Sequence, residues 1–210
     1  MSCERFMAPN PENIKRFRRQ LLRWFGLHRR DYPWRRTRNP WRVLIAEMML
    51  QRTRADQVEK VYREFFTKFK KPSDAAIASS RTFRSTLLPL GLHWRIVNFR
   101  ALARAIAATP GARVPRTRDE LRSLPGVGDY VAGAVSSVAF NQREWIVDAN
   151  VVRVFRRFFG IATSKEGRRD RHVIEMAKTY SDCRVPRETD KRALPHGRAT
   201  APARVDWRFR

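Results

Sequence analysis

Apolar residues recur at helical spacing along most of the chain, and this periodicity is the feature that most constrains the fold. Near the N-terminus, Ile14, Phe17, Leu21, Trp24 and Phe25 fall on one helical stripe. The same spacing returns in later segments, which are bounded by proline, glycine or capping residues. No segment alternates apolar and polar residues over the length of a strand. The sequence therefore predicts an all-α fold.

The chain is strongly basic, with 45 Lys and Arg against 20 Asp and Glu and a formal net charge of +25. Such a charge opposes compaction and favours a polyanionic partner. Nucleic acid is the leading candidate, an anionic membrane surface is the second, and a basic protein with no such partner is the third. No apolar run approaches the roughly 20 residues needed to cross a bilayer, and residues 1–10 lack the apolar stretch of a signal peptide. We therefore expect an intracellular protein.

A glycine-rich turn, Leu124-Pro125-Gly126-Val127-Gly128, lies between two expected helices. Two glycines separated by one apolar residue permit a tight hairpin with outward-pointing N–H groups, and the second helix presents its positive N-terminal end. This combination suits a DNA phosphate and needs no contact with a base. An ordinary turn between two helices is the alternative.

Three separated motifs carry a resemblance to a known family. They are LPGVGDYVAGAV, the later VDANVVRV, and WRVLIAEMMLQRT preceded by YPWR. Together they resemble the helix-hairpin-helix glycosylases of the endonuclease III and adenine DNA glycosylase superfamily, in the order and at the spacing of that family. The resemblance spans roughly residues 21–161 and implies base-excision repair of double-stranded DNA.

The resemblance assigns catalytic roles to Asp148 and Glu47. An N-glycosidic bond breaks with positive charge building on the sugar, so a carboxylate at Asp148 would stabilise that charge and orient water. Asp148 could instead only cap its helix. Glu47 stands in an otherwise apolar helix, where burial raises the pKa of a carboxyl towards that of a usable acid. A structural pair with Arg42 or Arg54 is the alternative for Glu47.

Position 130 determines the expected reaction type. Bifunctional relatives carry a lysine there, whose amine forms a Schiff base with the sugar and leads to strand cleavage. This chain has Tyr130, and a phenol cannot form that imine. The resemblance is therefore nearest to the branch that releases thymine from G·T mismatches, with water as the nucleophile. A packing role for Tyr130 at the start of its helix is the alternative.

Further residues are expected to contact DNA. Flipping a base out of the duplex costs a few kcal/mol, which phosphate contacts offset. The expected DNA-binding residues are Gly126, Val127, Gly128, Gln51, Arg52 and Arg153. The resemblance suggests that Gln51 helps to fill the gap left by the flipped base, and a plain surface role is equally open.

The resemblance also implies two helical lobes with the catalytic residues in the cleft between them. One lobe would cover residues 41–145, and the other would combine residues 1–40 with 146–185. Most relatives end with four cysteines that hold an iron–sulfur cluster. This chain has two cysteines, with only Cys183 near that region, so we expect no [4Fe–4S] cluster and no other metal or cofactor.

Residues 186–210 contain three prolines and scattered arginines, with no apolar stripe of either period. This composition predicts disorder, and its contrast with the family suggests a truncated or out-of-frame end. The expected function is monofunctional removal of thymine or uracil opposite guanine, by a monomer associated with the nucleoid and not with a membrane. The alternatives are an adenine DNA glycosylase acting opposite guanine or oxidised guanine, and a catalytically inactive DNA-binding remnant.

Overall fold

A computed structural model describes residues 11–91 and 93–181, and within them every regular element is a helix. The all-α prediction is confirmed. The described residues divide into two compact units, the larger formed by residues 31–91 and 93–146 and the smaller by residues 11–30 together with 147–181. The helices of the larger unit are η1 (Pro33–Arg36), α2 (Pro40–Leu50), α3 (Ala55–Lys68), α4 (Pro72–Ile77), α5 (Ser80–Leu87), η2 (Leu88–Leu90), α6 (His93–Ala107), η3 (Pro110–Ala112), α7 (Arg118–Arg122) and α8 (Asp129–Phe140).

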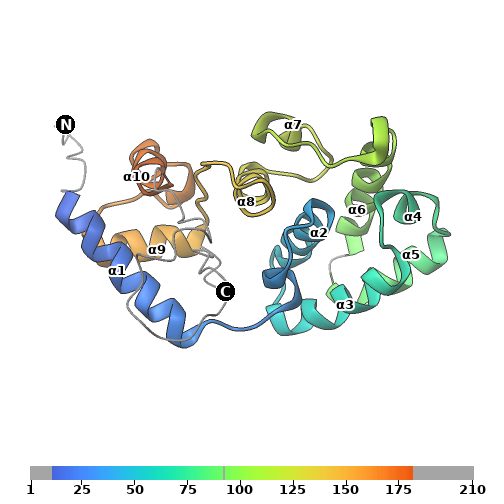
Figure 1. The fold of residues 1–210 in the computed structure, drawn as a ribbon, viewed down its shortest axis with the longest axis horizontal. Coiled ribbons are helices and arrows are strands. Elements are labelled where there is room, and N and C mark those ends of the chain that lie inside the picture. The colour runs from blue at the N-terminus through green and yellow to red at the C-terminus, as the bar shows by residue number, and fades with distance from the viewer. Residues whose placement is uncertain (1–10, 92, 182–210) are drawn as a thin grey trace, which may run out of the picture. The chain divides into compact units, whose positions relative to one another are not determined.

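Helix α2 is the centre of the larger unit (Figure 1). Pro40 begins it, and the Asn39 side chain accepts a hydrogen bond from the Arg42 N–H at the first turn. From Val43 to Leu50 every side chain is buried, as an apolar circumference predicts. Helices α3 and α8 both pack against α2, and α4 packs against α6. The residues expected on α2 and α8 are therefore carried by one packed pair of helices.

The segment before α2 belongs to the larger unit. We expected residues up to 40 to join the other lobe, whereas the structure groups residues 31–40 with the larger one. The reason is aromatic burial: Tyr32 and Trp34 stack with ring centroids 4.7 Å apart, and Trp34 packs edge-on against Tyr62. The Tyr32 hydroxyl also donates to the Asp56 carboxylate at 2.6 Å, which ties this segment to α3.

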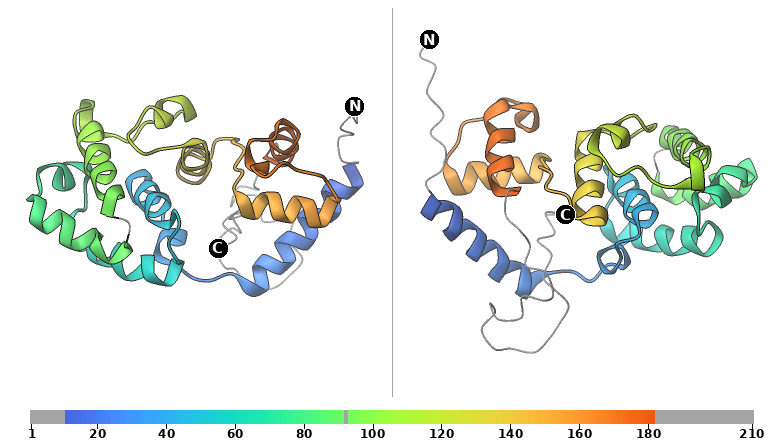
Figure 2. Two further views of the ribbon diagram at one scale, coloured as in Figure 1. Left: turned by 180° about the vertical axis from the view of Figure 1, so that it is seen from behind. Right: turned by 45° about the horizontal axis from the view of Figure 1, so that its top comes forward.

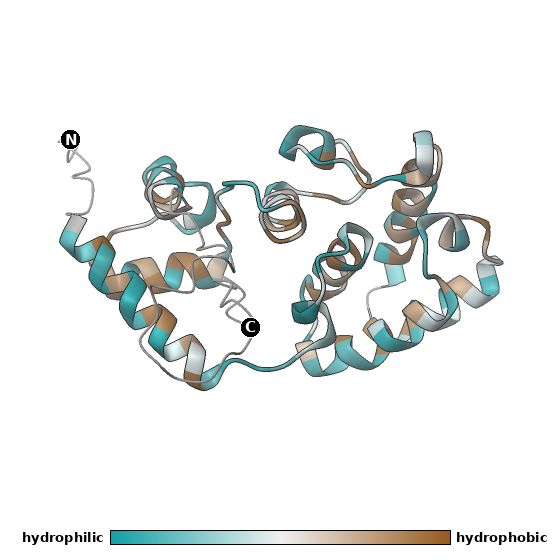
Figure 3. Cartoon of the chain, viewed as in Figure 1, coloured by the Kyte–Doolittle hydropathy of each residue, from teal (hydrophilic) through white to brown (hydrophobic). Residues whose placement is uncertain are grey.

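The smaller unit is built from α1 (Pro11–His28), α9 (Ala149–Phe159), η4 (Gly167–Arg169) and α10 (Arg171–Ser181). Figure 2 shows α1 and α9 side by side from two further directions. Phe17 fixes this pairing, because its ring contacts those of Phe155, Phe158 and Phe159 on α9. In Figure 3, α1 carries hydrophobic colour at spaced positions among hydrophilic ones, as expected for an amphipathic helix.

The expected disordered tail, residues 186–210, lies outside the described residues, as do Cys3 and Cys183. Among the helices that the structure describes, none combines the length and the apolar character needed to cross a bilayer.

Candidate excision site and nucleic-acid interface

The glycine-rich turn joins α7 to α8, as the sequence predicts. Helix α7 begins with a capping box: the Thr117 side chain accepts from the Glu120 N–H, and the Glu120 carboxylate accepts from the Thr117 N–H at 3.1 Å. The bond from the Thr117 hydroxyl and that from its N–H hold the pKa of Glu120 below its ordinary value. This box sets the direction of the chain as it enters the turn.

Gly126 is required at the apex of the turn. Its φ is +76°, in the left-handed region that favours glycine. A Cβ atom at this position would also lie 2.9 Å from Met48 Cε and 3.0 Å from Asn98 Cβ. The turn is therefore seated directly on α2 and α6.

Val127 and Gly128 have different roles in the turn. The Val127 N–H donates to the Leu124 carbonyl at 3.1 Å and its side chain is buried, so this residue anchors the turn from inside. Gly128 is exposed and stands at the N-cap of α8, where it has no side chain with which to cap the first turn. The exposed glycines and the beginning of α8 form the surface that an anion can approach.

The carboxylate of Asp129 in the first turn of α8 is balanced by arginines of α7. Arg122 Nε lies 2.9 Å from Asp129 Oδ1, and Arg118 Nη2 lies 4.0 Å from the same atom. The negative charge beside the turn is thus compensated within the protein, which reduces its repulsion of an approaching anion.

Arg118 connects the turn to the segment that leaves α8. Its guanidinium donates to the Glu144 carboxylate at 2.9 Å, to the Trp145 carbonyl at 3.0 Å and to the Asp129 carbonyl at 3.0 Å. Gly133 permits this arrangement, because a Cβ atom there would lie 2.6 Å from the Trp145 oxygen and 2.8 Å from Arg118 Nη1. Sequence reasoning missed Arg118, since an arginine in the first turn of a short helix has the pattern of a surface charge.

Asp148 stands at the N-cap of α9 with its carboxylate held in a fixed orientation. Oδ1 accepts from the Asn150 N–H at 2.9 Å and from the Val151 N–H at 2.8 Å, and Oδ2 accepts from Asn150 Nδ2 at 3.0 Å. Asp148 therefore does cap its helix, as the alternative interpretation of the sequence proposed. This capping is compatible with a catalytic role, because the side chain is half-buried and keeps part of its surface in solvent.

Glu47 is 1% exposed and lies in the centre of α2. The two arginines considered as its partners have other neighbours. The Arg42 guanidinium lies over the Phe66 ring at 4.8 Å, and Arg54 Nη2 lies 3.8 Å from Asp56 Oδ2. The structure thus places a carboxyl group deep in the helix that the sequence assigned to the catalytic acid.

Tyr130 lies in the first turn of α8, half-buried against the core that surrounds α2. This packing matches the alternative role given to Tyr130 in the sequence analysis, that of a core-packing residue at the start of its helix. The position is occupied by a phenol and carries no amine.

Gln51 and Arg52 follow the last residue of α2, Leu50. Gln51 is the C-cap, and its side chain donates towards Met48 Sδ at 3.6 Å. Arg52 is exposed and has a φ of +55°, an uncommon conformation for a residue with a side chain.

A buried arginine that the sequence did not reveal holds this end of α2. Arg95 is 4% exposed and donates to the carbonyls of Met48 and Gln51 and to the Thr53 hydroxyl. These bonds satisfy carbonyl groups at a helix end. Within α6 only the apolar stripe is apparent from sequence, so a buried cation on this helix had no signal.

The expected site residues are divided between the two units. Glu47, Gln51, Arg52, Tyr130 and the turn belong to the larger unit, whereas Asp148 and Arg153 belong to the smaller one. The expectation that they share a cleft therefore stays a prediction. Among the described residues, no three His, Cys, Asp or Glu side chains form a group that could hold a metal ion, and Cys183 lies outside those residues. The expected absence of an iron–sulfur cluster also stays a prediction.

Comparison with known proteins agrees with the arrangement of these motifs. The profile of the HhH-GPD superfamily of base excision DNA repair proteins matches residues 45–178. A thymine/uracil-DNA glycosylase of Methanothermobacter thermautotrophicus is 38% identical over 160 residues, which cover 76% of this chain and 72% of that protein. A thymine-DNA glycosylase of Aeropyrum pernix is 37% identical over 155 residues, 73% of this chain and 70% of that protein.

The solved structure of a thermostable thymine-DNA glycosylase is also similar, with a TM-score of 0.76 and 36% identity. It covers 83% of this chain, and the chain covers 79% of it. The adenine DNA glycosylase of Rattus norvegicus is 33% identical over 195 residues, which are 88% of this chain and 38% of that longer protein.

Proposed function

Because the chain belongs to the HhH-GPD superfamily of base excision DNA repair proteins, we propose that it is a monofunctional DNA glycosylase that removes thymine or uracil paired with guanine. The similar thymine and thymine/uracil glycosylases support this substrate class. The observation that carries the proposal is the carboxylate of Asp148, oriented by three hydrogen bonds and partly open to solvent.

Asp148 stabilises the reacting sugar. As the glycosidic bond breaks, positive charge develops on the deoxyribose, and an oriented carboxylate lowers the energy of that state without having to reorganise. The same carboxylate directs a water molecule at the sugar carbon. The two backbone donors at the start of α9 hold Oδ1 in place throughout.

Glu47 supplies the proton that the departing base needs. A carboxyl group surrounded by the apolar residues of α2 is suited to general acid catalysis, which contributes about 10²–10⁴ in rate. Tyr130 replaces the lysine of bifunctional relatives, so water is the nucleophile and the product is an intact abasic strand.

DNA is held through its phosphates. The exposed Gly126 and Gly128 with the beginning of α8 receive one phosphate, as backbone N–H groups at a helix start do. Gln51 and Arg52, braced by Arg95, occupy the gap left by the flipped nucleotide. Arg153 adds a further phosphate contact from α9.

We further propose that the protein holds no iron–sulfur cluster and works as a monomer at the cell's nucleoid DNA. The four-cysteine ligand set of such a cluster cannot be assembled from the two cysteines in this sequence. Iron analysis of the purified protein tests the absence of a cluster, and sedimentation tests the monomeric state. Bound iron would contradict the first statement, and a stable dimer would contradict the second.

The assay for the reaction uses labelled duplexes that carry G·T, G·U or G·A mismatches, each treated with or without alkali. Strand cleavage of the G·T and G·U duplexes only after alkali is expected. Cleavage without alkali would overturn the monofunctional assignment. Abasic product from G·A alone would identify an adenine DNA glycosylase, and binding without product from any duplex would identify an inactive remnant.

A further inference from the structure

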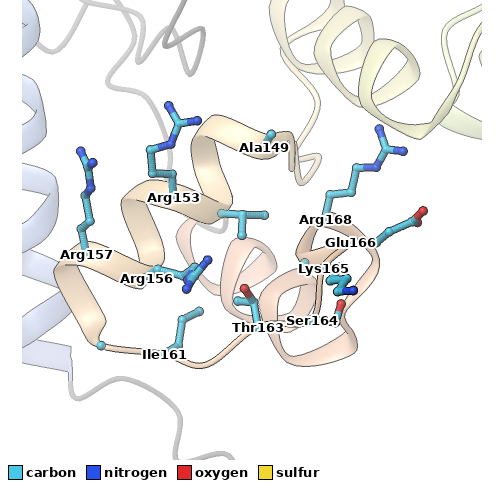
Figure 4. A pocket seen from close by; sticks show the side chains of 13 residues that line it. Ala149, Arg153, Arg156, Arg157, Ile161, Thr163, Ser164, Lys165, Glu166 and Arg168 are labelled. Carbon is cyan, nitrogen blue, oxygen red and sulfur yellow. The ribbon is translucent and has the colours of Figure 1, made fainter.

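A hollow of about 780 Å³ lies in the smaller unit, between α9 and the segment that leads to α10 (Figure 4). Gly167 lets this segment approach the helix closely: a Cβ atom there would lie 2.8 Å from Val152 Cγ1 and 3.0 Å from Thr163 Cβ. The wall of the hollow is therefore built by a specific close contact.

The hollow is lined by cations. They come from both sides of it and are Arg153, Arg156, Arg157, Lys165 and Arg168. Glu166 is the acidic residue of the lining, and Arg169 binds its carboxylate at 3.1 Å. Within residues 11–91 and 93–181, none of the five cations is within ion-pair distance of a carboxylate. Their mutual repulsion is therefore not offset by acidic side chains of the described part of the protein.

The hollow also contains hydroxyl groups with different surroundings. Ser164 is engaged by Asp170, since its N–H and its hydroxyl donate to that carboxylate at 2.7 and 2.5 Å. Thr163 Oγ1 is buried and has no hydrogen-bond partner among the described residues. A buried hydroxyl without a partner is costly, and an oxygen-rich ligand in the hollow would satisfy it.

We propose that this hollow is a second phosphate-binding site, occupied by backbone phosphates of the duplex away from the flipped nucleotide. The inference rests on the proposed function only in taking DNA as the polyanion. Arg153, Arg156 and Arg157 span one turn of α9, so their side chains lie close together on the helix surface, and Arg168 faces them across the hollow. Figure 4 shows these guanidinium groups at separate points around the hollow, and each can bind an oxygen of a phosphate backbone.

The test compares two triple variants that each lose three positive charges. The hollow variant carries Arg156→Gln, Arg157→Gln and Arg168→Gln. The control carries Arg81→Gln, Arg84→Gln and Arg104→Gln, which are exposed arginines of the larger unit. The affinity of each protein for an undamaged duplex is measured between 50 and 200 mM salt. The logarithm of the affinity falls with the logarithm of the salt concentration, and each lost phosphate contact makes this slope shallower by about 0.9. The ratio of the affinity at 50 mM to that at 200 mM salt should therefore fall about 3.5-fold for each lost contact.

We expect the slope of log affinity against log salt concentration to be shallower in the hollow variant than in the wild type, and unchanged in the control. Equal slopes in the two variants, or a slope for the hollow variant equal to that of the wild type, would overturn the proposal. Urea unfolding midpoints close to that of the wild type verify that both variants are folded.

A second arm separates DNA phosphates from a free phosphate ion. Inorganic phosphate is titrated at constant ionic strength while the thermal midpoint is recorded. Stabilisation of the wild type but not of the hollow variant, together with unchanged duplex slopes, would assign the hollow to a free ion and overturn the DNA assignment. A shallower salt dependence of duplex affinity in the hollow variant supports the DNA assignment, whether or not inorganic phosphate also stabilises the wild type.

The binding measurement is independent of base excision. If the wild type produces no abasic site on any mismatch but the slopes differ, the proposed function fails and the phosphate site stands. If the wild type excises thymine and the slopes do not differ, only the phosphate site fails.

Discussion

The guanidinium carbon of Arg118 lies 3.7 Å from the centroid of the Trp145 ring, and Nη1 of the same arginine donates to the Trp145 carbonyl. This pair fixes the last residues of the larger unit before the chain enters the unit that carries Asp148. A cation over an indole ring combines attraction to the ring face with planar hydrogen bonding, which lysine reproduces only in part.

Arg118→Ala should therefore lower both stability and activity. The side chain is 12% exposed, and loss of its hydrogen bonds to charged and carbonyl groups is expected to cost about 2 kcal/mol. Urea denaturation measures this loss, and single-turnover excision measures the effect on the reaction. Arg118→Lys is the matched control: it should recover part of the stability but little of the excision rate. If lysine restored both in full, the planar contacts of Arg118 would not matter.

Asp148→Asn should abolish excision and preserve the helix. The Asn oxygen can still accept from the Asn150 and Val151 N–H groups, so the cap survives while the negative charge is lost. We expect at least about a 100-fold fall in single-turnover rate with unchanged duplex affinity. Asp148→Ala removes the cap as well and should lower the free energy of unfolding by about 1 kcal/mol. Wild-type turnover by the Asn variant would remove Asp148 from the mechanism.

Glu47→Gln removes the acidic proton of Glu47 while keeping the shape of the side chain. The two side chains have nearly the same shape, so the packing of α2 should be retained, and the amide cannot donate the proton of a carboxylic acid. A fall in excision rate of about 10²–10⁴ is expected, with the far-UV circular dichroism spectrum unchanged. Met49→Leu in the same buried helix is the control, and it should leave the rate near that of the wild type. A rate for Glu47→Gln equal to that of this control would assign Glu47 a purely structural role.

The two glycines of the turn should respond differently to alanine. At Gly126 the left-handed φ and the contacts with Met48 and Asn98 oppose a Cβ atom, so Gly126→Ala should destabilise the protein by about 1–3 kcal/mol. At Gly128 a Cβ atom would meet nothing within 4 Å, and φ is −97°. Gly128→Ala should leave the urea midpoint unchanged and weaken duplex binding, because its methyl group stands where a phosphate would approach. Unchanged binding would place the phosphate elsewhere.

Stability in acid should depend on Asp170. Hydrogen bonds from the Ser164 hydroxyl and N–H lower the pKa of Asp170 below its ordinary value of 3.8. A lowered folded-state pKa means that the contribution is present above the ordinary value and is lost as the pH falls through the folded value. Thermal midpoints of wild type and Asp170→Asn should therefore differ at neutral pH and converge as the pH falls below about 3.8. A difference that persisted in acid would contradict this linkage.

Local signals predicted much of the fold and the residues of the candidate site. The apolar circumference of α2, the capping box of Thr117 and Glu120, and the turn around Gly126 all occur where the sequence indicates. The family resemblance drawn from the same motifs is confirmed. Each of these features depends on neighbours within a few residues, which a single sequence displays directly.

Long-range contacts were not predictable in the same way. Arg95 is buried and Arg118 is partly buried, because carbonyl groups remote in sequence accept their hydrogen bonds. The sequence surroundings of both residues resemble those of surface arginines. Tyr32 and Trp34 belong to the larger unit because they pack against Tyr62 and bind Asp56. The basic hollow depends on the close approach of Gly167 to Val152. In each case the deciding partner is remote in sequence or carries no periodic signal.

The close packing of Gly126 against Met48 should limit how α2 can be altered to change the base that the protein accepts. Met48 follows Glu47 directly, and its sulfur also receives the Gln51 amide. Met48 thus links the neighbourhood of the proposed catalytic acid to the backbone of the turn that we propose binds a phosphate. Variants selected for a new base through this part of α2 should therefore show altered affinity for undamaged DNA as well.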